Sequence, residues 1–125
     1  MIIRGFLVAS VVYGVIGLGL GLHMAIGGNH GQMPTHAHLM VLAWLSFFCF
    51  GIFYKIFESA LANRLAKVHF WLAQISTPVM FIGLGGLYGS NPELEPLAAG
   101  GSIVYAISFV IFALVVIRTT SSNQA

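Results

Sequence analysis

The stretch "GQMPTHAHLMVLAW", residues 31–44, marks the point where a short polar turn passes into a long apolar segment. Pro34 suits the first turn of a helix, because the N–H that it lacks would have no partner there. The apolar character continues to about residue 57, which supplies the roughly 20 residues needed for one crossing of a bilayer core. We therefore expect a membrane-spanning helix over residues 35–57, with His36 and His38 in its first turn.

The rest of the chain has the same pattern on both sides of this segment. Short breaks with turn-forming residues, "GGNHGQMP", "ESALANRLAK" and "SNPELEP", divide it into further apolar runs over residues 5–26, 66–89 and 97–118. Of the 125 residues, 58% are hydrophobic and only 6% are charged, a composition typical of polytopic membrane proteins. The sequence predicts an all-α fold with a single transmembrane domain, residues 1–125, built as a four-helix bundle.

The cations indicate how the bundle is oriented. All of them lie at the N-terminus, around the second connection or near the C-terminus: Arg4, Lys55, Arg64, Lys67 and Arg118. Because Lys and Arg concentrate on the cytoplasmic side of membrane proteins, we expect both termini to be cytoplasmic, in a bacterial-type inner membrane. The net charge of +2 provides no basic footprint for a nucleic acid, so the bilayer is the expected environment and no nucleic-acid partner is expected.

This orientation places His36 and His38 near the outer face, with His23 about one turn from the end of the first helix. His69 begins the third span on the other side of the membrane. On a helix, residues i and i+2 diverge by about 200°, so His36 and His38 cannot bind one ion together. Paired ligands on one helix are spaced i,i+3 or i,i+4. If both histidines are ligands, each serves a different site.

The segment "THAHLMVLAW" resembles the histidine-bearing helices of subunit I of the heme-copper oxidase superfamily, which includes cytochrome c oxidases and nitric oxide reductases. In that family one histidine of an H-x-H pair binds a low-spin heme iron and the other binds a high-spin heme iron on the opposite side. The family subunit has twelve helices in approximate three-fold symmetry, and this chain is similar in size to one third of it. The resemblance also includes "FGIFYK", which closes the second span.

This resemblance implies a homotrimer in which His36 of one protomer and His38 of the next hold a heme b at each interface. The implied function is electron transfer or binding of a diatomic gas, O2 or NO. Iron held by two imidazoles favours electron transfer unless one ligand leaves. His23 is a candidate third ligand or a partner of a heme propionate.

Several features of the superfamily are absent from the sequence. Apart from His23, no second histidine on another outer-layer helix could build a three-histidine copper centre. The outer connections contain no Lys or Arg to hold heme propionates, and no span contains a carboxylate or lysine for a proton channel. The sequence therefore leaves open whether the protein is an enzyme, what its redox partner is and whether copper is ever bound.

Two other function classes fit parts of the sequence. Met24, Met33 and Met40 flank the outer histidines, and thioether with imidazole suits Cu(I), as in a copper-handling or transport protein. A structural or assembly subunit of a membrane complex would use its glycine pairs, Gly17 with Gly21 and Gly85 with Gly89, for close helix packing.

Three further residues are expected to have no role in ligation. We expect His30 and His69 to be interfacial residues and Cys49 to be buried and inert.

Overall fold

The computed structural model describes residues 1–122, and these are almost entirely helical. The elements in chain order are α1 (Ile2–Gly27), α2 (Met33–His38), the π-helix η1 (Leu39–Leu45), α3 (Ser46–Ile56), the 3-10 helix η2 (Glu58–Ala62), α4 (Arg64–Leu87), the 3-10 turn η3 (Pro92–Leu94) and α5 (Glu95–Ser122). No strand occurs among residues 1–122. The predicted all-α class is confirmed.

Four helical rods cross the molecule, because α2, η1 and α3 join end to end into one. Each rod is long and apolar enough to span a membrane: Ile2–Gly27, Met33–Ile56, Arg64–Leu87 and Pro92–Ser121. The predicted spans agree with these rods to within a few residues. The chain thus has the architecture of an integral membrane protein with four spans.

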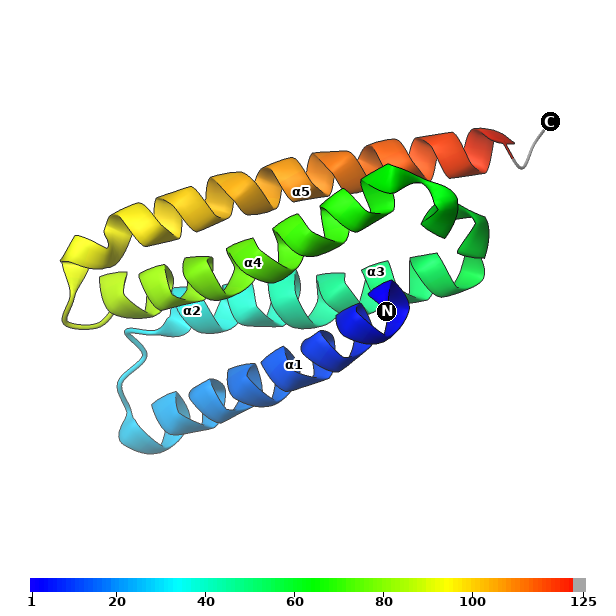
Figure 1. Ribbon diagram of the computed structural model, residues 1–125. Coiled ribbons are helices and arrows are strands. Elements are labelled where there is room, and N and C mark those ends of the chain that lie inside the picture. Colours follow the sequence, from blue (N-terminus) through cyan, green and yellow to red (C-terminus); the bar gives the residue numbers. More distant parts are fainter. Residues whose placement is uncertain (123–125) are drawn as a thin grey trace.

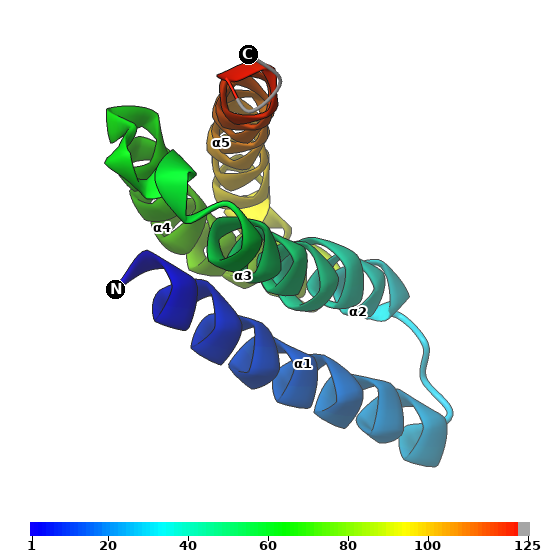
Figure 2. The ribbon, with the colours of Figure 1, turned by 90° about the vertical axis from the view of Figure 1, so that its right-hand side faces the viewer.

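The rods run alternately up and down, so that the N-terminus, η2 and the end of α5 lie together (Figure 1). We call this the terminal end. The distal end is the opposite one, where the connections 28–32 and 88–94 lie. Figures 1 and 2 both place α1 and α5 on opposite sides of the rod formed by α2, η1 and α3.

An aromatic core fills the terminal half of the bundle. Phe47, Phe50 and Tyr54 recur at a helical spacing and bury the same face of α3. Phe6 of α1 packs edge-on against Phe47, with ring centroids 5.2 Å apart, and Phe112 of α5 lies 4.6 Å from Phe50. Phe70 of α4 also packs edge-on against Phe6, with ring centroids 5.2 Å apart. All four rods therefore contribute rings to one cluster, which fixes their relative positions.

Helices α4 and α5 make the closest contact, at two glycines. A Cβ on Gly83 would lie only 2.1 Å from the backbone nitrogen of Ala98, and one on Gly101 would lie 2.5 Å from that of Met80. These are backbone-to-backbone approaches of the kind that small residues allow in membrane helices. By contrast, a Cβ on Gly85 would meet nothing within 4 Å. Gly89 follows the end of α4, and a Cβ there would lie 2.7 Å from the Gly85 carbonyl oxygen, so the predicted Gly85–Gly89 pair does not pack α4 against α5.

Cys49 differs from its expected environment. The side chain is exposed on the surface of the rod, because it lies between Phe47 and Phe50, which take the buried face of α3. In a membrane this surface faces lipid or another protein, and the thiol is accessible from there.

Candidate ligand histidines at the distal end

His36 packs against α1. Its Nδ1 lies 2.8 Å from the carbonyl oxygen of Gly17, and a Cβ on Gly21 would come within 2.9 Å of the His36 ring. Glycine at position 21 therefore provides the space in which the imidazole lies. Both glycines of the predicted pair on α1, Gly17 and Gly21, lie against the rod that carries His36. Gly21 makes room for the histidine ring.

His38 lies in a different environment on the same helix. It is exposed, and its Nδ1 lies 2.6 Å from the carbonyl oxygen of Pro34, one turn earlier. With Ala37, Val41 and Leu42 it lines a shallow, mostly apolar surface depression of about 270 Å³. The two rings thus have different neighbours, as expected for residues separated by about 200° around a helix.

These contacts determine the tautomer of both rings. A carbonyl oxygen can only accept a hydrogen bond, so in neutral His36 and neutral His38 the proton must be on Nδ1. Each Nε2 then carries the free lone pair. A backbone carbonyl that holds Nδ1–H is also the usual outer contact of a histidine that ligates metal through Nε2. Both contacts therefore leave Nε2 as the ring nitrogen that could bind a metal ion.

Gln32 fixes the start of this helix. Its Nε2 donates to the carbonyl oxygen of Gly85 at 2.9 Å, and its Oε1 accepts from the Thr35 hydroxyl at 2.7 Å. The first of these bonds joins the α1–α2 connection to α4. The first turn of α2 is therefore tied to α4 through Gln32 and to α1 through the contact of His36 with Gly17.

A π-helical segment follows directly after His38. Its wider turn is closed at Ser46, whose backbone N–H and hydroxyl both donate to the carbonyl of Val41, five residues earlier, the hydroxyl at 2.8 Å. In addition, Tyr105 of α5 donates to the Leu42 carbonyl at 2.7 Å. Single π-turns in helices occur frequently at functional sites, and this one offsets α3 around the rod relative to the histidine turn.

His23 lies apart from this pair. It is exposed and lines a separate polar cavity of about 260 Å³ with the neighbouring Met24, the 29–32 connection and residues 88–90. Within residues 1–122, no group of three His, Cys, Asp or Glu side chains is arranged to hold a metal ion. The role of His23 as an additional ligand stays a prediction.

His69 is buried, contrary to the interfacial position expected for it. Its side chain is 0% exposed, and its Nδ1 lies 3.0 Å from the hydroxyl of Tyr54. Rings of Phe6, Phe50 and Phe112 surround it, and among residues 1–122 its Nε2 has no hydrogen-bond partner. Sequence reasoning missed this pair because Tyr54 and His69 come together only when α4 folds back along α3.

No protein-family model, no curated protein and no solved structure matches this chain. The function is therefore argued from the residues and their geometry.

Proposed function

We propose that this protein is a heme-b-binding integral membrane protein in which His36 and His38 are the axial iron ligands. The observation that carries the proposal is the shared tautomer of the two rings: each Nδ1 is held by a backbone carbonyl, at 2.8 and 2.6 Å, and each Nε2 is left as a lone-pair donor. Neutral imidazole is a standard axial ligand of heme iron.

The divergence of the two rings supports ligation between copies of the chain. Because His36 and His38 face different surroundings, one protomer does not offer both to one iron. A second copy whose His38 faces the His36 of the first would complete the coordination of one iron. In a closed trimer every His36 meets a His38 of the neighbouring copy. This is the arrangement implied by the resemblance to oxidase subunit I.

The heme would supply one-electron redox chemistry and, with one ligand released, a site for O2 or NO. The contribution of the chain is to hold each Nδ1 on a backbone carbonyl and to place both imidazoles at one depth near the distal end. The cations support the orientation with the terminal end in the cytoplasm. Accordingly, the histidines belong to the outer leaflet.

An optical spectrum of the purified protein tests the proposal. After expression with ample heme, we expect the Soret and alpha bands of low-spin, six-coordinate heme b in the reduced-minus-oxidised spectrum. His36→Ala and His38→Ala should each abolish these bands, whereas His30→Ala, which removes an exposed histidine of the same end, should leave them unchanged. A colourless protein, or bands that survive both ligand substitutions, would refute the assignment and favour a structural subunit.

Copper handling is a second candidate, supported by the cavity at His23. His23 and the buried Met24 line the same cavity. Imidazole with thioether forms a soft ligand set for Cu(I). Metal analysis that finds copper without heme, reduced in His23→Ala, would favour this function over heme binding.

A further inference from the structure

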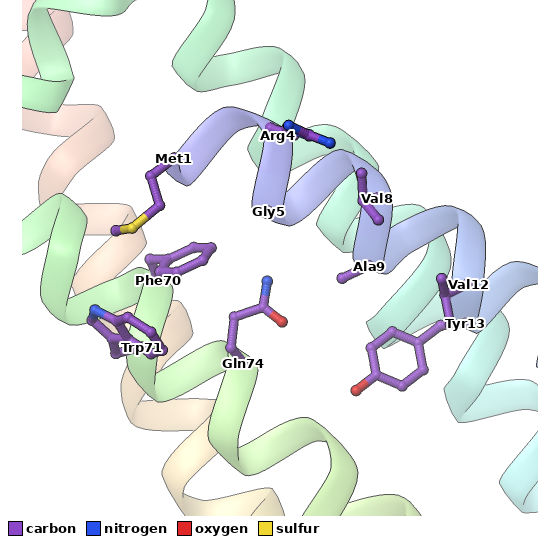
Figure 3. Close-up of a pocket in the computed structure, with 10 residues that line it drawn as sticks. All are labelled: Met1, Arg4, Gly5, Val8, Ala9, Val12, Tyr13, Phe70, Trp71 and Gln74. Atoms are coloured by element: carbon purple, nitrogen blue, oxygen red, sulfur yellow. The ribbon is translucent and has the colours of Figure 1, made fainter.

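A groove runs between α1 and α4 in the terminal half of the molecule. Its volume is about 680 Å³, and Figure 3 shows the side chains that line it. Gly5 allows the two helices to approach here, because a Cβ at this position would lie 2.6 Å from the Phe70 ring. Val8 and Val12 of α1 form one wall and Phe70 and Trp71 of α4 form the other.

Polar groups occur at one end of this groove. Arg4 lies at its rim, and the carboxamide of Gln74 extends from α4 toward Gly5, with Nε2 3.8 Å from the position of a Cβ there (Figure 3). Within residues 1–122, neither Arg4 nor Gln74 has an ion-pair or side-chain hydrogen-bond partner. The ion pair found there joins Lys55 and Glu58. The Arg4 guanidinium and the Gln74 amide are thus two hydrogen-bond donors in the groove that have no acceptor among the described residues.

The other end of the groove is apolar and continues further along α1. Tyr13 also lines a second cavity of about 340 Å³, which extends past Ile16 and Leu20 and is bounded by Pro78 and Ile82 on α4. From residue 5 to residue 20 the path along α1 is about 22 Å at 1.5 Å per residue. This exceeds the roughly 15 Å of hydrocarbon in one leaflet, so the groove and the second cavity together are long enough for a complete acyl chain.

We propose that this groove binds an anionic phospholipid. The phosphate interacts with Arg4, an ester carbonyl accepts from Gln74 Nε2, and one acyl chain lies along Val8, Val12 and Tyr13. Guanidinium is the side chain best suited to a phosphate, and Trp71 at the same end is a residue type favoured at the headgroup level. The proposal needs the membrane-spanning architecture but does not depend on heme binding.

A second copy of the chain is a poorer occupant, because it offers no free acidic side chain for Arg4. The chain has three acidic residues. Glu58 is hydrogen-bonded to Lys55 at 2.6 Å, and Glu93 and Glu95 belong to η3 and the start of α5, at the distal end. Charge complementarity therefore favours a lipid phosphate.

Native mass spectrometry of the detergent-purified protein, with phosphatidylglycerol or phosphatidylcholine added, tests the proposal. We expect one retained phosphatidylglycerol per chain and weaker retention of phosphatidylcholine. Arg4→Gln should weaken phosphatidylglycerol retention by about fivefold or more. Lys67→Gln removes an equal charge at the same end, outside the groove, and should leave retention unchanged.

A second pair of variants separates a defined site from general attraction to anionic lipid. Val8→Trp fills the groove and should abolish retention, whereas Val11→Trp, on an equally exposed valine that does not line it, should have no effect. Equal retention of the two lipids, equal effects of Arg4→Gln and Lys67→Gln, or retention by Val8→Trp would overturn the proposal. So would efficient disulfide cross-linking of Val8→Cys between copies in a Cys49→Ala background, because it would assign the groove to a protein contact.

Discussion

At the scale of single residues, the position of His36 depends on the absence of a side chain at Gly21. The sequence predicted that His36 and His38 diverge, since that follows from helix geometry alone. It could not predict their tautomers, because the carbonyl that holds His36 belongs to Gly17 of another helix. Similarly, the contact between His69 and Tyr54 arises only from the return of α4 along α3.

If His36 ligates heme as proposed, Gly21→Ala should weaken heme binding through this contact. The added Cβ would lie 2.9 Å from the His36 ring, so the imidazole must shift away from the Gly17 carbonyl, at a cost of about 1–3 kcal/mol. A heme titration should show about tenfold or greater loss of affinity. Gly19→Ala is the matched control, because a Cβ there meets nothing within 4 Å. Equal affinities of the two variants would contradict this role of Gly21.

The buried pair of Tyr54 and His69 should show strong energetic coupling. Tyr54→Phe leaves both nitrogens of His69 without partners in the aromatic core, and this should lower the free energy of unfolding by about 1–3 kcal/mol. Adding His69→Phe removes the unpartnered group, and the double variant should recover part of the loss. Denaturation in detergent of the single and double variants measures the coupling. Additive effects would show that the hydrogen bond contributes little.

At the scale of elements, the four spans were predictable because each needs only an apolar run of sufficient length between turn-forming residues. The π-helix η1 was not, since "LMVLAWL" is apolar throughout and has no periodicity that separates a π-turn from an α-turn. The packing glycines of α4 and α5 were also misassigned. Gly83 and Gly101 are used in place of Gly85 and Gly89, and a spacing of four residues along one helix does not show which face meets its neighbour.

Two adjacent glycines of α5 should therefore respond oppositely to the same substitution. Gly101→Ala places a methyl group 2.5 Å from the Met80 backbone and should destabilise the protein by about 1–3 kcal/mol. Gly100→Ala adds a methyl group where nothing lies within 4 Å and should be neutral or stabilising by about 0.5–1 kcal/mol. Thermal unfolding in detergent compares them. A Gly100→Ala variant that is as unstable as Gly101→Ala would contradict the helix contact described.

At the scale of the whole molecule, the arrangement of α1 and α5 on opposite sides of the histidine-bearing rod leaves both helices with long exposed apolar faces. Lipid covers such faces in a membrane, and copies of the chain can cover them in an assembly. The proposed bis-histidine site requires an assembly of several copies, because His36 and His38 of one chain face different surroundings. A single protomer is then an incomplete binding unit.

Mixing two ligand variants tests this claim most directly. In His36→Ala protomers only His38 remains, and in His38→Ala protomers only His36 remains, so neither forms a bis-histidine site alone. If each iron is ligated by two copies, co-expressing the two variants should restore part of the low-spin heme spectrum at interfaces where the intact histidines meet. A mixture that stays as devoid of low-spin heme as the separate variants, while the unsubstituted protein binds it, would contradict ligation between copies.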